Sequence, residues 1–192
     1  MDLVSLFNSE FEEHGVVAEA THASLREPFE RLVGHAVECI REGGKILFFG
    51  NGGSAADCQH LATELTIRYV SDRDPIAAIA LTTDTSAITA GGNDIGFDNI
   101  FSRQVEALVK PGDLALGIST SGNSENVVRA LKQARDMGAI AAGFGGNNGG
   151  AMAEVADPYL VVPSKTTSRI QEMHIMLGHM LCDALENELG LV

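Results

Sequence analysis

The chain has 192 residues, a length that predicts one domain with at most a small extension. Its 13 basic and 26 acidic residues give a formal net charge of −13, and a chain this acidic repels nucleic-acid backbones and anionic membrane surfaces. The sequence holds no apolar run of about 18 residues, which a membrane-spanning helix requires. We therefore expect no nucleic-acid or membrane partner. Because the first residues lack the basic and apolar pattern of a secretory signal, we also expect a cytoplasmic location.

Residues 1–42 are expected to form a helical extension in two pieces, ahead of one domain over residues 43–192. Pro28 is placed at the first helical position of the second piece, where its missing N–H has no partner to lose. Across residues 29–40, apolar side chains recur at helical spacing, and this predicts one apolar stripe along the second helix.

Beyond residue 43, short apolar runs alternate with helical segments. Strands are predicted at residues 45–49, 77–81, 113–118, 140–144 and 159–162. Helices are predicted at residues 54–69, 86–90, 125–137 and 168–188, with a turn at 91–94. Strands that are apolar throughout are typical of a parallel sheet covered on both faces. The sequence therefore predicts a doubly wound α/β fold with a five-stranded parallel sheet, whose ligands bind beyond the carboxyl ends of the strands.

A run of hydroxyl side chains follows the third predicted strand and precedes a helix. Its members are Ser119, Thr120, Ser121 and Ser124. The N–H groups at a helix N-terminus attract anions, and hydroxyls add donors without bulk, so the run predicts a phosphomonoester site. It matches neither the P-loop nor the dinucleotide fingerprint. The alternative is an ordinary helix-capping loop, which needs one such residue rather than several.

Two further polar turns are candidates for sugar contacts. Asn51, Gly52 and Gly53 follow the first strand, where glycines let the backbone approach a ligand closely. Asn93 and Asp94 follow a pair of glycines and can bond sugar hydroxyls. A tight turn explains the residues after the first strand nearly as well as a sugar site does. For Asn93 and Asp94, an Asx turn is the simpler explanation.

A candidate metal site comes from two helices. His60 and Glu64 lie four residues apart on the helix after the first strand, so their side chains share one face. On the closing helix, Gln171 and His179 are eight residues apart and lie roughly on one side. If the two helices face each other, the four side chains suit zinc or a similar divalent ion. The alternative is a solvated helix pair without a metal.

Four longer segments occur together in this chain: GNGGSAADCQHLATEL at 50–65, LTTDTSAITAGGNDIGFDNIFSRQ at 81–104, GISTSGNSENV at 117–127 and SRIQEMHIMLGHMLC at 168–182. In this order and spacing they resemble the sugar-isomerase (SIS) domain family, most closely its bacterial phosphoheptose isomerases. The resemblance implies one zinc ion per subunit, bound by His60, Glu64, Gln171 and His179. It implies substrate contacts from Asn51, Gly52, Gly53, Glu64, Asn93, Asp94, Ser119, Thr120, Ser121, Ser124 and Gln171. It also implies a homotetramer with active sites between subunits and with N-terminal helices in its core.

The resemblance further implies an aldose–ketose isomerase that converts sedoheptulose 7-phosphate to D-glycero-D-manno-heptose 7-phosphate through an enediolate. This reaction is the first step of ADP- or GDP-heptose biosynthesis. Glu64 is then the base for the carbon-bound proton, and His179 moves protons on the sugar oxygens. A non-catalytic binding module that associates with the replication initiator DnaA resembles the same fold, but lacks this Glu and this His. Because Glu64 and His179 are both present, the sequence favours the enzyme.

Overall fold

The structure is a computed structural model and describes residues 2–192. Five parallel strands form one sheet in the order β2-β1-β3-β4-β5. Their bounds are Ile46–Gly50 (β1), Ala78–Ala80 (β2), Leu114–Ile118 (β3), Ile140–Gly146 (β4) and Tyr159–Val162 (β5). The strand order reverses between β1 and β3, and in such sheets ligands bind at this switch point. The expected five-stranded parallel sheet is confirmed.

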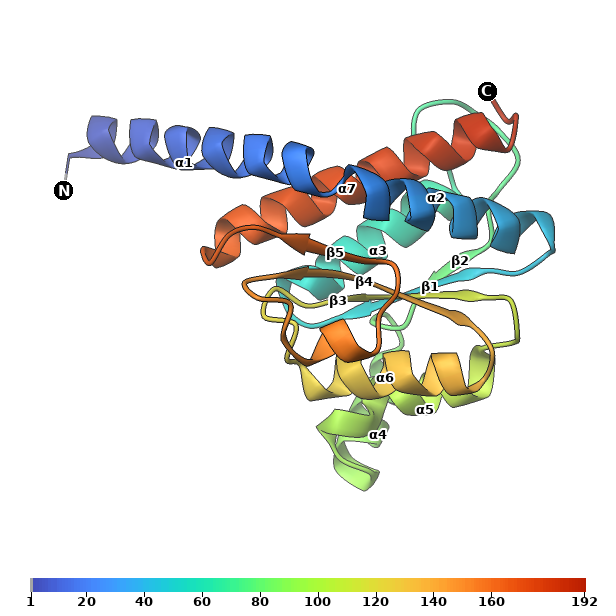
Figure 1. Ribbon diagram of the computed structural model, residues 1–192. Helices are drawn as coiled ribbons and strands as arrows, with labels where there is room; N and C mark the ends of the chain where they lie inside the picture. The colour runs from blue at the N-terminus through green and yellow to red at the C-terminus, as the bar shows by residue number, and fades with distance from the viewer. Residues whose placement is uncertain (1) are drawn as a thin grey trace.

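Helices cover both faces of the sheet (Figure 1). One face carries α2 (Arg26–Arg41), α3 (Gly53–Thr66) and α7 (Thr167–Glu188). The other face carries α5 (Ile100–Leu108) and α6 (Glu125–Asp136), with α4 (Thr85–Asp94) packed against α5. The remaining elements are α1 (Leu3–Ser24) and two short 3-10 helices, η1 (Phe97–Asn99) and η2 (Gly150–Glu154).

Alternation along the strands divides the core into two layers. On β1, Ile46 and Phe48 join the core under α2, α3 and α7, whereas Leu47 and Phe49 join the core under α5 and α6. All four side chains are fully buried. Burial on both faces explains why the strands carry apolar residues throughout, and it holds the loops after β1 and β3 at one edge of the sheet.

The structure corrects the turn expected at residues 91–94, which form the last turn of α4. This helix starts after Asp84, whose carboxylate accepts a hydrogen bond from the N–H of Ala87 (2.9 Å). Gly91 lies against Ile100 of α5 at an ordinary van der Waals distance. Capping and tertiary packing thus override the poor helix propensity of glycine.

Three other details of the helices differ from expectation. No element is expected where α5 lies, although Ile100, Phe101 and Val105 are buried along it. Pro28 is the third residue of α2 and not the first, which the helix tolerates because N–H groups of the first turn have no intrahelical partner. Finally, α3 ends at Thr66, three residues before its expected end.

The two expected N-terminal helical pieces are confirmed, and α1 projects from the body of the molecule (Figure 1). Its middle is fastened to α7. Arg169 donates a hydrogen bond to the carboxylate of Glu10 (2.8 Å), and His14 Nδ1 lies 2.8 Å from a carboxylate oxygen of Glu172. Across residues 2–192, no helix combines the length and apolar character needed to cross a membrane.

Candidate active site

The loop after β1 is fastened to the first turn of α6 by two amide side chains. Asn51 and Asn126 bond reciprocally, with N···O distances of 2.8 and 2.9 Å, and Asn126 is buried. Both ends of the Asn51 amide are therefore engaged by the protein. Gly52, which follows, has a φ of +57°, a conformation that favours glycine. A ligand at this loop would meet backbone groups rather than a free Asn51 side chain.

The hydroxyl groups of the serine loop, residues 119–124, converge at the N-terminus of α6. Ser119 Oγ lies 2.9 Å from Ser124 Oγ and 3.5 Å from Ser121 Oγ. Ser124 is the N-cap residue of α6, yet its side chain makes no capping hydrogen bond. The hydroxyl is therefore not used to cap the helix. This favours the phosphate interpretation over the capping alternative, because a helix N-terminus attracts anions.

The glycine-rich loop after β4 packs against the serine loop. Asn147 donates a side-chain hydrogen bond to the carbonyl of Thr120 (3.1 Å), and the N–H of Ala151 donates to Asn123 Oδ1 (2.9 Å). Asn147 has a φ of +57°, and asparagine tolerates this left-handed conformation better than most residues. No role is predicted for this loop from the sequence, although its run of glycine and asparagine is a signal for one. Its contacts give it a supporting role beside the serine loop.

Three potential metal ligands meet where α3 and α7 face each other. His60 Nε2 lies 2.9 Å from Glu64 Oε1 and 3.4 Å from His179 Nε2. The three ligand atoms all lie within 4.8 Å of one another. Ligands of a tetrahedral zinc ion are themselves separated by about 3.4 Å, so this donor set fits zinc. One chain supplies all three, so these two facing helices belong to the same subunit.

The fourth predicted ligand, Gln171, lies apart from this cluster. A Cβ built on Gly53 would come within 2.5 Å of the Gln171 amide nitrogen, so Gln171 packs over the first residue of α3. The Gln171–Gly53 contact and the His179–His60 contact lie at different heights along the two helices. On α7, His179 follows Gln171 by eight residues, a rise of about 12 Å. On α3, His60 follows Gly53 by seven residues, a rise of about 11 Å. Within one chain, the structure brings Gln171 to the β1 loop and not to Glu64.

Two residues that the sequence analysis does not single out border the cluster. The ring centroid of Tyr69 lies 5.6 Å from that of His179. Asp57 precedes His60 by one turn of α3; burial raises the pKa of its carboxyl, while the imidazoles of His60 and His179 act in the opposite direction. The spacing to His60 was a signal for Asp57. No sequence signal marks Tyr69, because the segment after α3 must fold back to place it there.

Asn93 and Asp94 lie at the end of α4, and both are exposed. The Asn93 amide donates to a carboxylate oxygen of Asp94 (2.7 Å). Within residues 2–192, no hydrogen bond joins either residue to another predicted site residue. The structure thus presents this pair to solvent and does not bring it to the serine loop.

Two residues left out of the predicted site are buried. His174 Nε2 donates a hydrogen bond to the carbonyl of Gly145 (2.9 Å), and burial lowers the pKa of His174 to about 4. This imidazole is therefore neutral at pH 7. Cys58 is fully buried in the core beneath α3. Both positions agree with a packing role for these side chains.

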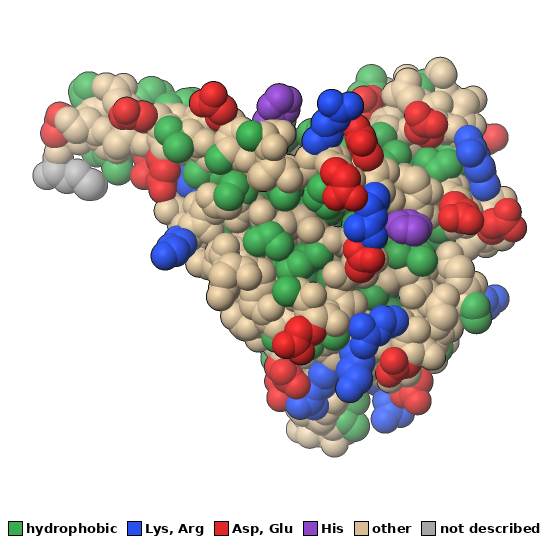
Figure 2. All heavy atoms as spheres, viewed as in Figure 1, with side chains coloured by type: hydrophobic (Ala, Val, Ile, Leu, Met, Phe, Trp, Pro, Cys, Tyr) green, Lys and Arg blue, Asp and Glu red, His purple; other side chains and the backbone are tan. Residues whose placement is uncertain are grey.

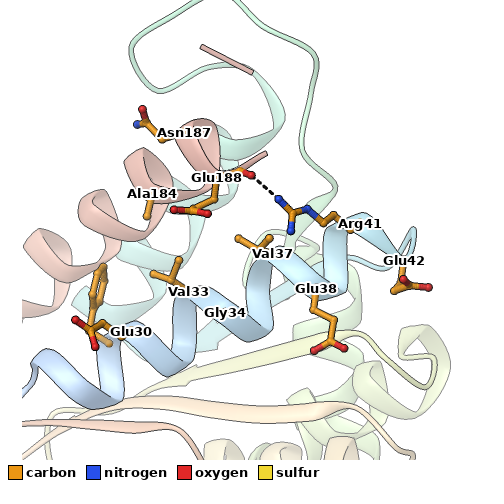
Figure 3. A pocket seen from close by; sticks show the side chains of 11 residues that line it. Glu30, Val33, Gly34, Val37, Glu38, Arg41, Glu42, Ala184, Asn187 and Glu188 are labelled. Atoms are coloured by element: carbon orange, nitrogen blue, oxygen red, sulfur yellow. Dashed lines mark hydrogen bonds between the residues drawn. The ribbon is translucent and has the colours of Figure 1, made fainter. Parts of the chain in front are cut away.

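A groove of about 590 Å³ between α2 and α7 is separate from these residues. Figure 3 shows Val33 and Val37 pointing into it and Glu38 at its outer side. Arg41 crosses its end and donates to the backbone carbonyl of Glu188 (2.7 Å). The groove shares no lining residue with the predicted site.

The similarity to known proteins extends over nearly the whole chain. Residues 11–146 match the model of the SIS domain. A phosphoheptose isomerase from Paramagnetospirillum magneticum is 58% identical over 186 residues, which are 97% of each chain. One from Aliarcobacter butzleri is 54% identical over 181 residues, covering 94% of this chain and 96% of its own. The solved structure of a phosphoheptose isomerase from Neisseria gonorrhoeae is 43% identical and matches with a TM-score of 0.91, covering 97% of this chain and 100% of that one. The chain therefore belongs to the SIS domain family and, within it, to the phosphoheptose isomerases.

Proposed function

We propose that this chain interconverts sedoheptulose 7-phosphate and D-glycero-D-manno-heptose 7-phosphate. The observation that carries the proposal is the cluster of His60, Glu64 and His179. Moving a hydrogen between C1 and C2 of a sugar requires a base for carbon and a proton carrier for oxygen. The cluster supplies a carboxylate and two imidazoles within 4.8 Å of one another. The names of the relatives support the choice of a phosphoheptose as substrate.

The substrate phosphate is assigned to the serine loop. Ser119, Thr120, Ser121 and Ser124 offer hydroxyl donors at the positive end of α6. The backbone of Asn51, Gly52 and Gly53, and the side chains of Asn93, Asp94 and Gln171, are assigned to the sugar. Between Gly53 and His60, α3 rises by about 11 Å, so a substrate that reaches from the β1 loop to the cluster is long. A seven-carbon phosphosugar meets that requirement better than a triose phosphate.

In this mechanism, Glu64 removes the proton from one carbon and returns it to the neighbouring carbon. His179 carries the proton between the two substrate oxygens, and His60 holds the Glu64 carboxylate through the 2.9 Å contact. Binding of the distant phosphate orients the reacting carbons against Glu64, so that binding energy serves positioning. Zinc is assigned to His60, Glu64 and His179, and when bound it would supply a Lewis acid that polarises the substrate oxygens.

The alternative is a binding module without catalysis. Such a module needs the serine loop but has no use for a carboxylate held between two helices. Here Glu64 is half-buried and lies against His60. This placement is expected of a catalytic base and not of a surface residue without a catalytic role. The enzyme is therefore the better-supported function.

The direct test of this mechanism is Glu64→Gln. The substitution preserves the size and polarity of the side chain but removes the base, so turnover should fall by at least about 100-fold, the lower end of the usual contribution of a general base. Binding of the sugar phosphate, measured by calorimetry, should remain. The matched control is Glu106→Gln, an exposed carboxylate on α5, which should leave turnover unchanged. Normal turnover in Glu64→Gln would contradict the assignment.

We further infer a homotetramer with active sites at its subunit interfaces. Large apolar side chains are exposed along α1, namely Leu3, Val4, Leu6, Phe7, Phe11 and Val16. Figure 2 shows hydrophobic side chains along this projecting helix. On α7, Met176 and Met180 are also exposed beside His179. Soluble monomers rarely expose contiguous apolar surface of this kind, so further copies of the chain are the proposed cover.

A cytoplasmic location is part of the same proposal. All three cysteines, Cys39, Cys58 and Cys182, are buried and free of disulfides. Free thiols are typical of proteins in a reducing compartment, so the cysteine state supports this location.

A further inference from the structure

A buried ion pair lies between α7 and the segment that follows α3. Arg73 Nε and Glu186 Oε1 are 2.9 Å apart, and the side chains are only 1% and 2% exposed. Among the ion pairs of residues 2–192, no other has both side chains so deeply buried. Desolvating two charges costs about as much free energy as their attraction returns. The ion pair therefore adds little to the free energy of unfolding, and we look for its role in the elements that it holds together.

Arg73 holds the last turn of α3. Its Nη2 donates to the backbone carbonyl of Glu64 (2.8 Å), and its Nη1 donates to the carbonyl of Leu65 (2.7 Å). These carbonyls belong to the end of the helix, where they have no intrahelical partner, and the positive guanidinium complements the negative end of the helix dipole. A single planar side chain thus joins the backbone of Glu64 to Glu186.

Glu186 holds the other side of the cluster. It follows His179 by seven residues, which is two turns of α7, so the two side chains share a face. Its Oε1 also accepts a hydrogen bond from the backbone N–H of Tyr69 (3.2 Å). The ring of Tyr69 in turn packs beside the ring of His179. Glu186 is therefore linked to His179 both along α7 and through Tyr69.

The shape of the cluster depends on the spacing of two helices, because Glu64 belongs to α3 and His179 to α7. Catalytic and metal-binding groups need to be held within about 0.5 Å of their working geometry. We propose that Arg73, clamped by Glu186, is a positioning residue that sets the distance between Glu64 and His179. The inference rests on the proposed function, since it takes this cluster as the reacting one.

The test compares Glu186→Gln with a matched control, Asp113→Asn. Asp113 is also 2% exposed; it pairs with Lys45 and accepts a hydrogen bond from the N–H of Lys110 (2.7 Å). It precedes β3 and so lies at the opposite edge of the sheet from the serine loop. Each substitution neutralises one buried carboxylate and keeps its size, so each should lower the thermal midpoint. Only Glu186→Gln alters the contact between α3 and α7.

Two quantities are measured for each protein well below its own unfolding temperature. The first is kcat and KM with sedoheptulose 7-phosphate, and the second is the zinc affinity of the apoprotein by competition with a chelator. We expect Glu186→Gln to lower kcat at least about 10-fold with little change in KM, and to weaken zinc binding about 10- to 100-fold, the usual effect of losing a contact that orients a ligand. Asp113→Asn should keep the wild-type kcat and zinc affinity.

Wild-type kcat and zinc affinity in folded Glu186→Gln would overturn the proposal. An equal loss of kcat in Asp113→Asn would also overturn it, because the loss would then follow stability alone. Should Glu186→Gln fail to fold, Arg73→Lys decides the question, since lysine keeps the charge but lacks the planar guanidinium whose separate nitrogens reach Glu186 and the two carbonyls; its kcat should fall.

The same measurements separate this proposal from the proposed function. If the wild-type protein binds no zinc, the metal assignment fails and the kcat comparison decides the role of Arg73. If the wild-type protein binds zinc but does not turn over sedoheptulose 7-phosphate, the substrate assignment fails. The zinc affinities of the variants then decide the role of Arg73.

Discussion

His174 and His179 stand five residues apart on α7 in opposite environments. His174 is fully buried, with its Nε2 bonded to the carbonyl of Gly145. His179 is half-buried, and its Nε2 lies 3.4 Å from that of His60. Five residues turn a helix by about 140°, so the two rings face different neighbours. His174 therefore has a packing role, whereas His179 can bind a metal ion or transfer a proton.

The burial of His174 predicts a loss of stability in acid. Its pKa is about 4 in the folded protein against 6.5 for an exposed histidine, so the unfolded chain binds more protons between these values. The free energy of unfolding should fall as pH drops from 6.5 toward 4, by up to about 3 kcal/mol from this residue.

Urea unfolding at pH 7 and pH 4.5 checks this prediction. His174→Gln does not titrate, so its loss of stability between the two pH values should be smaller than that of the wild type. His22→Gln, at an exposed site on α1, should keep the full loss. An equal loss in His174→Gln and the wild type would contradict the argument.

For single residues, sequence spacing predicts which face of a helix a side chain occupies. The spacing of His60 and Glu64 correctly indicated a shared helix face. The spacing of Gln171 and His179 indicated a common side of α7 but not the rise of about 12 Å between them. Arg73 gave no signal, because its role depends on how an irregular segment folds back onto α3.

At the scale of helices, α3 and α7 approach closely at Gly178. A Cβ on Gly178 would lie 2.5 Å from the Leu61 side chain, and Leu61 is fully buried, so it has no room to move away. Gly178→Ala should therefore force the helices apart and lower the free energy of unfolding by about 1–3 kcal/mol. Because His179 is the next residue, the contact with His60 should lengthen and kcat should fall.

Gly34→Ala is the matched control for this change. Gly34 lies within α2, and a Cβ there would meet nothing within 4 Å. Alanine is the better helix former, so this variant should be unchanged or more stable by up to about 1 kcal/mol. Urea unfolding and kcat measurements compare the two variants. Equal effects of the two substitutions would show that close packing at Gly178 does not matter.

Most elements follow from local sequence patterns, and the exceptions have physical causes. The continuous apolar runs predicted all five strands, because a sheet covered on both faces leaves no room for polar residues. The continuation of α4 through Gly91 and Gly92 could not be predicted from local sequence, because glycine is a poor helix former and the helix is held by its packing against α5 and η1. The early end of α3 depends on the fold-back that brings Arg73 to its carbonyls.

At the scale of the whole molecule, α1 projects from the body and exposes large apolar side chains. A monomer would leave these side chains in water. Phe7 and Phe11 are 64% and 66% exposed, and each should contribute about 2 kcal/mol when buried between subunits. The double variant Phe7→Ser with Phe11→Ser should therefore shift the protein from tetramer toward smaller species in analytical ultracentrifugation. Phe97→Ser, at another exposed phenylalanine away from α1, should remain tetrameric. A monomeric wild type would contradict the proposed assembly.

The proposed function makes this phosphoheptose isomerase dependent on zinc. Its most direct test incubates the purified protein with sedoheptulose 7-phosphate, follows formation of the aldose 7-phosphate, and repeats the assay after chelation and after zinc is restored. We expect turnover that the chelator abolishes and zinc restores. A folded, zinc-loaded protein that binds the sugar phosphate but forms no aldose would contradict it.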